Sequence, residues 1–267
     1  MAREVDIAAL GELLIDFTEA GYSKDGMKLF EQNPGGAPAN LLTVASHMGY
    51  KTAFIGKVGT DMHGAFLKKT LQKEGIDTTA LIEDEHYFTT LAFVEIDENG
   101  ERNFSFARKP GADTQLRKEE LDKELLRNCK IFHFGSLSLT DEPARSATLE
   151  AVKTAKETGA LISYDPNYRA SLYEEAAEVL LSLGLKLVAI TLGEDGVLVA
   201  TKNGKEHVAG FHTNAIDTTG AGDSFWGGFL SRFLSLNKAV EELTGENIRA
   251  CAVQGNAVAC LCVQKRG

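Results

Sequence analysis

A glycine-rich turn at residues 220–223 is the strongest candidate for chemistry in this chain. Gly220, Ala221 and Gly222 are small, and they precede Asp223 at the start of a run with helical character. Such a turn presents bare backbone N–H groups at the positive end of a helix dipole, where phosphate binds. A carboxylate beside that phosphate could take the proton of an attacking hydroxyl. The turn therefore predicts phosphoryl transfer, although a close-packed helix cap would have the same local pattern.

Flanking residues favour the phosphate interpretation of this turn. Asp217 and Thr219 place oxygen ligands just upstream, and Gly227 and Gly228 leave one side of the following helix without side chains. The chain has neither a Walker A loop nor a Rossmann glycine fingerprint. The two commonest phosphate-loop templates are therefore excluded, and the turn at 220–223 remains as the candidate.

Several motifs in a fixed order resemble those of one enzyme family. Residues 216–229 resemble the second signature of the ribokinase-like (PfkB) family of carbohydrate kinases, and residues 33–49 resemble the first signature. Further matches fall at residues 11–16, 55–61, 108–113, 165–169 and 191–196. The segments Gly11-Glu-Leu-Leu-Ile-Asp-Phe and Arg108-Lys-Pro-Gly-Ala-Asp are most similar to the fructokinase branch.

The resemblance implies a soluble enzyme that transfers the γ-phosphate of ATP to the 6-hydroxyl of fructose. It implies ATP and Mg²⁺ as cofactors, with K⁺ as a further candidate held by Asp217 and Thr219. A 2-keto-3-deoxygluconate kinase would share the fold and the base, so it remains an alternative. A non-catalytic fructokinase-like sugar sensor or assembly protein is the alternative from another class. The intact Asp223 and glycine turn favour the enzyme.

Site residues follow from the resemblance and from local chemistry. Asp223 is the expected base, with Gly220, Ala221 and Gly222 as the anion hole. Asp16, which we expect to end the first strand, would accept hydrogen bonds from sugar hydroxyls. The other expected sugar-site residues are Gly35, Gly36 and Asn40 at a helix start, Arg102 and Phe104 from a lid, and Asn167 and Arg169 after a strand. Arg169 would meet a phosphate, although a plain surface arginine would fit the same position.

The expected nucleotide site lies in the last third of the chain. Thr191, Gly193 and Gly196 end a strand and would offer a flat surface to the nucleotide. Asn256 resembles the family's adenine-side residue. Its helix, predicted at residues 248–260, is rich in Ala, Val and Cys, so core packing is the competing interpretation.

Alternating apolar and amphipathic runs predict the elements that position these residues. Strands are expected at residues 5–10, 52–58, 130–135, 161–164 and 187–191, and helices at 38–48, 62–74, 142–157, 174–183 and 222–235. This alternation predicts a single α/β domain over 1–267, with a doubly wound, mostly parallel sheet and helices on both faces. Segments 17–30 and 90–107 break the rhythm, and a hairpin signal falls at 97–100. Together they predict a small β lid, with a surface hairpin as the alternative.

Composition limits the possible partners. The net charge is −10, from 28 Lys and Arg against 38 Asp and Glu, and no basic block is present. Nucleic-acid binding is therefore not expected. The four cysteines form no Cys-x-x-Cys pair, no run is long enough to span a membrane, and no signal peptide is evident. We expect a cytoplasmic protein with reduced thiols, and a homodimer through the lid is a candidate assembly.

One interval departs from the family pattern. Between Asp165 and Thr191 the family usually adds a strand and an acidic helix start with an Asn-x-x-Glu motif, linked to Mg²⁺ and phosphate. Neither is evident here. Losing a strand inside a parallel sheet would leave its neighbours unpaired. We therefore expect residues to be missing from this sequence near 172–175, and further residues after 267.

Overall fold

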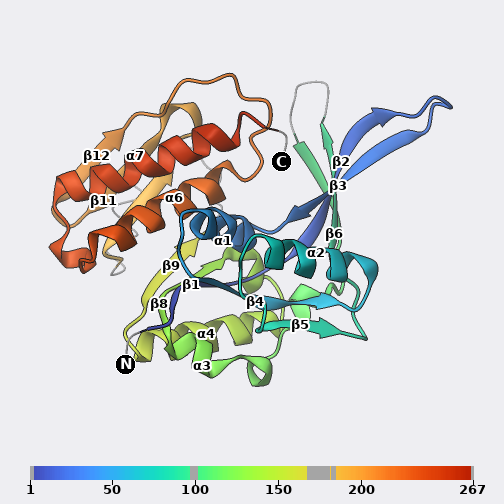
Figure 1. Cartoon of the computed structure of the whole chain (residues 1–267), viewed down its shortest axis with the longest axis horizontal. Helices are drawn as coiled ribbons and strands as arrows, with labels where there is room; N and C mark the ends of the chain where they lie inside the picture. Colours follow the sequence, from blue (N-terminus) through green and yellow to red (C-terminus); the bar gives the residue numbers. More distant parts are fainter. Residues whose placement is uncertain (1–2, 97–101, 167–180, 182–184, 266–267) are drawn as a thin grey trace. The chain divides into compact units, whose positions relative to one another are not determined.

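A computed structural model describes residues 3–96, 102–166, 181 and 185–265 of the chain. The chain forms two compact units, Met1–Pro166 and Asn167–Gly267, each of which is described by itself (Figure 1). The expected helix at 174–183 and the expected gap near 172–175 fall almost wholly outside the described residues. A single domain over the whole chain stays a prediction.

A five-stranded parallel sheet forms the centre of the first unit. Its order is β5-β4-β1-β8-β9, with every neighbouring pair parallel. The strands are β1 (Val5–Leu10), β4 (Thr52–Gly59), β5 (Leu81–Asp84), β8 (Cys129–Gly135) and β9 (Leu161–Asp165). Every residue of β4 is buried, as expected of a strand covered on both faces. The parallel sheet predicted from the apolar runs is confirmed.

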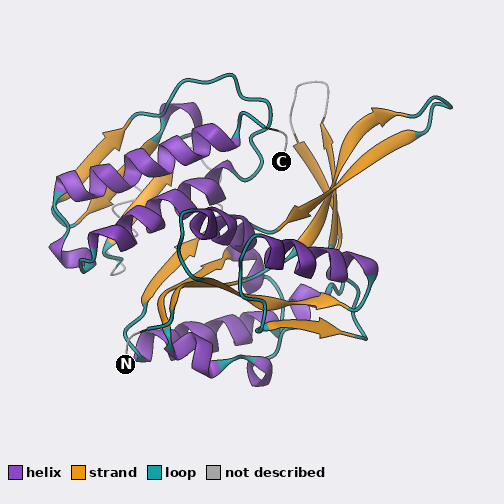
Figure 2. Cartoon of the chain, in the orientation of Figure 1, coloured by secondary structure: helices purple, strands orange, loops and turns teal. Residues whose placement is uncertain are grey.

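Helices cover both faces of this sheet, as predicted (Figure 2). The helices are α1 (Ala37–His47), α2 (Met62–Lys73), α3 (Lys123–Arg127) and α4 (Ala144–Glu157), with short 3-10 turns η1 (Ala112–Gln115), η2 (Lys118–Glu120) and η3 (Ser136–Leu139). α4 buries a stripe of alanines, Ala147, Ala151 and Ala155, against a core that includes Phe132 of β8. α1 and α2 lie on the other face of the sheet (Figure 1).

A second, four-stranded sheet projects from the same unit. Its order is β3-β2-β6-β7, made of β2 (Leu14–Tyr22), β3 (Lys28–Gly35), β6 (Leu91–Ile96) and β7 (Arg102–Ala107). β2 runs parallel to β6, whereas the two outer pairs are antiparallel. We call it the lid sheet. The predicted small sheet is confirmed, and its first part extends beyond the expected 17–30.

The position expected for Asp16 was wrong. Asp16 does not end the first strand: β1 stops at Leu10, and Asp16 is the third residue of β2 in the lid sheet. The buried residues Gly11–Leu13 carry the chain from one sheet to the other. Because these three residues are buried, no exposed polar loop separates the two strands.

The second unit contains an antiparallel sheet and two long helices. The sheet order is β10-β11-β12, from β10 (Leu187–Thr191), β11 (Val197–Thr201) and β12 (Gly204–Val208). Two 3-10 turns, η4 (Gly193–Asp195) and η5 (Val240–Glu242), accompany α6 (Ala221–Leu236) and α7 (Gly245–Cys262). β10 was expected in the parallel sheet. In the described part of the chain it pairs only with β11, because Gly196, at φ 94, lets the chain turn straight back.

Glycines bring α6 and α7 into close contact. A Cβ added to Gly228 would lie 2.9 Å from Val258 Cγ2 and 3.0 Å from the Gln254 carbonyl oxygen. A Cβ on Gly255 would lie 2.6 Å from the Phe225 ring. The glycine side of α6, where close packing was expected, therefore contacts α7.

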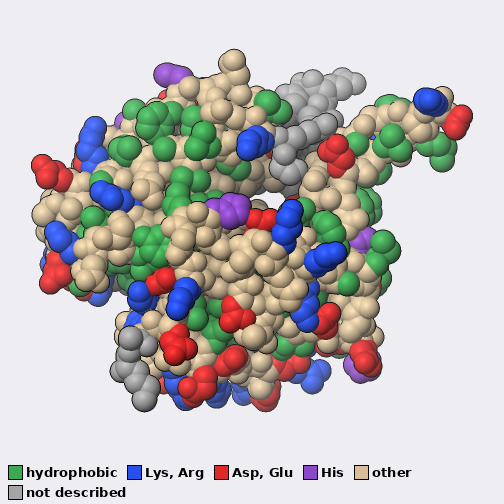
Figure 3. Space-filling model, in the orientation of Figure 1, with side chains coloured by type: hydrophobic (Ala, Val, Ile, Leu, Met, Phe, Trp, Pro, Cys, Tyr) green, Lys and Arg blue, Asp and Glu red, His purple; other side chains and the backbone are tan. Residues whose placement is uncertain are grey.

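Charged side chains are mixed on the surface. Lys and Arg stand among Asp and Glu on the face seen in Figure 3, and no basic field dominates that view. Among the described helices, none is long and apolar enough to cross a bilayer.

His133 makes the stability of the first unit sensitive to acid. It lies in β8, 2% exposed, and its Nδ1 is 2.9 Å from Ser163 Oγ on β9. Burial lowers the pKa of His133 from 6.5 to about 3. Between these values the unfolded chain binds a proton that the folded chain excludes. Stability therefore falls as the pH drops from 6.5 towards 3.

We predict that His133→Asn flattens this dependence, because the amide can still bond Ser163 but cannot titrate. The slope of unfolding free energy against pH should decrease by about 1.4 kcal/mol per pH unit in this window. Denaturant titrations at several pH values measure it, with the exposed His212→Asn as control. An unchanged slope in His133→Asn would show that another group carries the acid sensitivity.

Candidate active site

The N-terminus of α1 carries expected sugar-site residues of the first unit. β3 ends at Gly35, and Gly36 caps the helix at φ 125. A Cβ on Gly36 would lie 2.3 Å from the Glu12 carbonyl oxygen, so only glycine fits. The Ala37 N–H donates to Glu12 Oε1 at 3.0 Å. A buried carboxylate of the chain itself therefore holds the start of this helix.

Asp16 lies directly against this helix start. A Cβ on Gly35 would lie 2.1 Å from Asp16 Oδ2, because β2 and β3 place Leu14 opposite Gly35 and Asp16 opposite Asn33. Asn40 is half-buried in the first turn of α1, where its N–H donates to the Gly36 carbonyl at 3.0 Å. The structure thus brings together Asp16, Gly35, Gly36 and Asn40, four of the expected sugar-site residues. A carboxylate at Gly35 and an amide in the first turn of α1 are groups that can bind a ligand with several hydroxyls.

Two of the other expected sugar-site residues lie in the lid sheet. Arg102 and Phe104 lie on β7, at register positions opposite Ile96 and Val94 of β6. Asn167 and Arg169 fall outside the described residues.

Glu12 was not predicted to have a role, although it lies in the motif Gly11-Glu-Leu-Leu-Ile-Asp-Phe. Glu12 is 4% exposed and comes between β1 and β2. The available signal was a charged residue within an apolar run, since such residues are buried only when partnered.

The N-terminus of α6 carries the expected anion hole and base. Gly220 caps the helix in the left-handed conformation, φ 70, and has no side chain to bond the first turn. The Ala221 N–H donates to the Thr218 carbonyl at 3.3 Å. A Cβ on Gly222 would meet no described atom within 4 Å, so the space before it is open. Asp223, 9% exposed, stands in this first turn. An open glycine turn with a carboxylate is suited to a phosphate and its acceptor hydroxyl.

The C-terminal end of α7 fixes the loop before this turn. The N–H groups of Ile216 and Asp217 donate to the Val263 carbonyl at 2.7 and 3.2 Å. The Cys262 thiol donates to the Thr219 carbonyl at 3.5 Å, and Asp217 Oδ1 accepts the Thr219 N–H at 2.8 Å. Asp217 and Thr219, the expected cation ligands, are therefore neighbours in an ordered loop, and their cation remains a prediction.

The expected nucleotide residues lie around the end of β12. Asn256 is buried, and its Nδ2 donates to the Val208 and Ala209 carbonyls at 3.1 and 3.0 Å. A Cβ on Gly196 would lie 2.2 Å from the Val208 oxygen, so this glycine packs on backbone. Thr191 is exposed, and a Cβ on Gly193 would have open space. Gly196 and Asn256 therefore contact the backbone at the end of β12, whereas Thr191 is exposed and Gly193 has open space beside it.

Comparisons with known proteins cover both units. The model of the pfkB family carbohydrate kinase matches residues 5–183 and 173–267. Probable fructokinase-2 of Arabidopsis thaliana is 39% identical over 300 residues, covering 98% of this chain and 91% of that protein. The crystal structure of fructokinase from Vibrio cholerae O395 with fructose, ADP and calcium ion has a TM-score of 0.87 at 30% identity. It covers 98% of this chain and 94% of that one. The fructokinase of Xylella fastidiosa with bound ATP has a TM-score of 0.86 at 27% identity, over 99% and 94% of the chains.

The same comparisons show that a relative carries residues that this sequence lacks. The two family matches overlap at residues 173–183. The region aligned with the Arabidopsis thaliana protein is 300 residues long, although this chain has 267. That relative therefore has residues within the aligned region that this sequence lacks.

The Asp16 and Gly35-Gly36 motifs lie within the first family match, and the Gly220–Asp223 motif lies within the second. By these motifs and by a family match along nearly its whole length, the chain belongs to the pfkB family of carbohydrate kinases.

Proposed function

We propose that this protein is an ATP-dependent fructokinase that phosphorylates the 6-hydroxyl of fructose. The open glycine turn with Asp223 at the start of α6 is the observation that carries the proposal. The identity of about 39% to plant fructokinases supports fructose as the acceptor.

Each expected site residue has its own role in the proposed phosphoryl transfer. Backbone N–H groups of Gly220 and Gly222, on either side of Ala221, would stabilise the charge on the γ-phosphate. The fructose hydroxyl oxygen attacks the γ-phosphorus, Asp223 takes the hydroxyl proton, and the bond from the γ-phosphorus to the bridging oxygen breaks to release ADP. In the first unit, Asp16 and Asn40 would bind hydroxyls of the acceptor sugar.

ATP and Mg²⁺ are the proposed cofactors. Mg²⁺ is usually held by substrate phosphates, waters and one or two carboxylates. Among the described residues, no group of three or more His, Cys, Asp or Glu side chains is placed to hold a metal ion, so Mg²⁺ would be held mainly by the phosphates of ATP and by waters. Thr191 and Gly193 are proposed for the nucleotide, with Gly196 and Asn256 shaping the surface behind them. K⁺ would belong to the loop of Asp217 and Thr219.

A non-catalytic sugar-binding protein is the second candidate, and one observation favours it. The region aligned with the plant relative is longer than this chain, and no Asn-x-x-Glu lies between Asp165 and Thr191, where the family usually carries it. If that glutamate is missing from the protein itself, phosphate handling would suffer while sugar binding at Asp16 remained.

A homodimer through the lid sheet belongs to the proposal. Tyr22 and Met27, at the turn end of β2 and β3, are 66% and 68% exposed. Phe93 is also exposed, and its ring stacks on Phe17 at 5.2 Å and meets Phe30 edge-on at 5.8 Å. Exposed apolar groups of this extent favour a partner surface. The four free cysteines are consistent with a place in the cytoplasm.

A panel of acceptors tests the proposed function. Coupled measurement of ADP release should give the highest kcat/KM with fructose, among fructose, 2-keto-3-deoxygluconate, ribose, glucose and adenosine. Preference for 2-keto-3-deoxygluconate would reassign the substrate. Fructose binding without ADP release from any acceptor would favour the non-catalytic protein.

Asp223→Asn should reduce kcat by about 10²–10⁴-fold, because the amide keeps the shape of the side chain but cannot take a proton. Thermal melting should change little. Glu246→Gln is the matched control, since Glu246 is an acidic residue in the first turn of α7. Near wild-type turnover in Asp223→Asn would remove Asp223 from the role of base.

Gly35→Ala should raise the KM for fructose about tenfold or more, since displacing a carboxylate loses hydrogen bonds worth about 1–3 kcal/mol. The added methyl would lie 2.1 Å from Asp16 Oδ2, so the carboxylate must move. The KM for ATP should stay within about twofold of wild type if Asp16 serves the sugar alone. Gly245→Ala is the control, because a Cβ there meets no described atom within 4 Å. Equal effects on both substrates would mean that Asp16 only holds β2 in place.

A further inference from the structure

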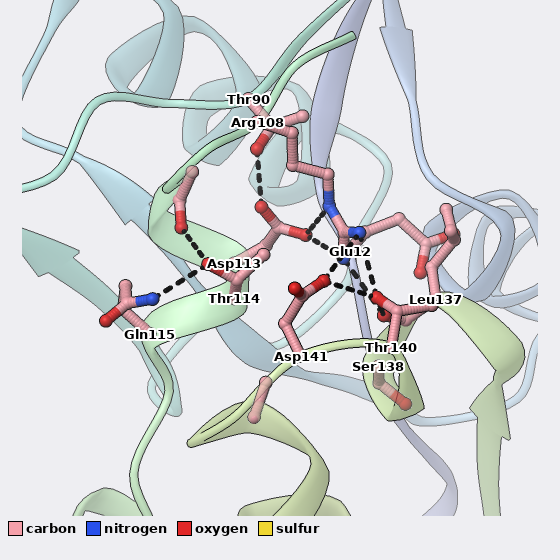
Figure 4. A network of polar contacts seen from close by, with 12 residues as sticks. Glu12, Thr90, Arg108, Asp113, Thr114, Gln115, Leu137, Ser138, Thr140 and Asp141 are labelled. Carbon is pink, nitrogen blue, oxygen red and sulfur yellow. Dashed lines mark hydrogen bonds and ion pairs between the residues drawn. The ribbon is translucent and has the colours of Figure 1, made fainter.

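A buried ion pair lies where the lid sheet joins the rest of the first unit. Arg108 follows the last residue of β7, and its Nε and Nη2 both approach Asp113 Oδ2 at 2.8 Å. Nη2 also donates to the Leu137 carbonyl at 2.9 Å, and Nη1 donates to Thr140 Oγ1 at 3.1 Å (Figure 4). All three guanidinium nitrogens are therefore engaged.

Asp113 connects this arginine to β6, a central strand of the lid sheet. Its second oxygen, Oδ1, accepts a short hydrogen bond from Thr90 Oγ1. Thr90 directly precedes β6, and its carbonyl accepts the Ile15 N–H of β2 at 3.1 Å. One carboxylate, whose side chain is 1% exposed, thus joins the end of β7 to the start of β6.

The contacts of Arg108 beyond Asp113 lead to the carboxyl edge of the parallel sheet. Leu137 belongs to η3, which follows β8 directly, and Thr140 comes just after η3. Asp141 Oδ2 lies 3.6 Å from Arg108 Nη1. The guanidinium therefore bridges the lid sheet and the central sheet.

The same corner leaves no room for rearrangement. A Cβ on Gly111 would lie 1.9 Å from Thr90 Oγ1 and 2.8 Å from Asp113 Oδ1. On the other side, Asp61 Oδ2 accepts the Thr89 N–H at 2.8 Å, and Thr89 Oγ1 accepts the Gly59 N–H at 3.0 Å. Residues 89 and 90 are thus fixed from both sides.

We propose that the Arg108–Asp113 pair is a positioning clamp that sets the orientation of Asp16 toward the sugar. Thr90 bonds Ile15, the residue before Asp16, and Asp16 pairs with Ala92 in the β2–β6 register. A shift of Thr90 therefore moves the Asp16 carboxylate. The inference rests on the proposed function, because it assigns Asp16 to the acceptor sugar. Arg108 and Asp113 need not touch the sugar themselves.

Arg108→Lys and Thr90→Val test the clamp. Lysine keeps the charge but cannot reach Asp113, Leu137 and Thr140 together, and valine removes one bond to Asp113. Each variant should raise the KM for fructose about tenfold, as the loss of a bond to a charged group predicts, with the KM for ATP within about twofold of wild type. Lys130→Met is the matched control, because Lys130 pairs with Asp6 at 2.7 Å toward the opposite end of β1 and β8.

Hydrogen exchange without substrates supplies a second readout that needs no turnover. Backbone amides of 14–22 and 91–96 should exchange faster in Arg108→Lys and Thr90→Val than in wild type, and Lys130→Met should leave them unchanged. If Arg108→Lys fails to fold, Thr90→Val still tests whether the bond to Asp113 fixes the lid strands.

Unchanged exchange in the lid strands, or equal increases in the KM for fructose and ATP, would overturn the clamp. Faster exchange in a protein that phosphorylates no fructose would refute the proposed function and the clamp's role toward the sugar.

Discussion

Two helix N-termini, one in each unit and each reached through glycines, determine where the expected site residues of that unit lie. At α1, Gly36 has a backbone conformation and a contact with the Glu12 carbonyl that exclude any Cβ. At α6, Gly220 caps the helix in the left-handed conformation, and Gly222 faces open space. Because a helix N-terminus attracts negative charge, the group that lies at each one indicates whether that helix start is already occupied by the chain itself. The chain's own Glu12 serves α1, whereas α6 presents a glycine turn and Asp223.

The lid sheet depends on the first of these helix starts and on the Arg108–Asp113 pair. Asp16 contacts Gly35 from one side and is linked through Ile15 and Thr90 to Asp113. A buried ion pair contributes little net stability, but removing one partner leaves an uncompensated charge. In the proposed clamp its value is geometric, since it holds the start of β6, which pairs with β2 at Asp16.

Much of the fold could be predicted because apolar runs and amphipathic runs alternate clearly. β1, β4, β8, α1, α2 and α4 agree with their expected ranges within a few residues, whereas α3 was not expected. The pairing of β10 could not be predicted, because an apolar run does not reveal whether its neighbour is parallel. The same holds for Asp16, since buried Gly11–Leu13 gave no turn signal between β1 and β2. The role of Arg108 depends on a contact five residues away across a tight turn, which spacing alone does not show.

The central claim is that the α6 turn positions ATP for transfer to the 6-hydroxyl of fructose. Phosphorus NMR of the protein with ATP, Mg²⁺ and fructose carrying a magnetic carbon isotope at the 6-position tests it most directly. The account predicts a new phosphate monoester coupled to that carbon, with one ADP formed for each ester. A phosphate signal that stays on ATP while fructose binds, or an ester at another carbon, would contradict it.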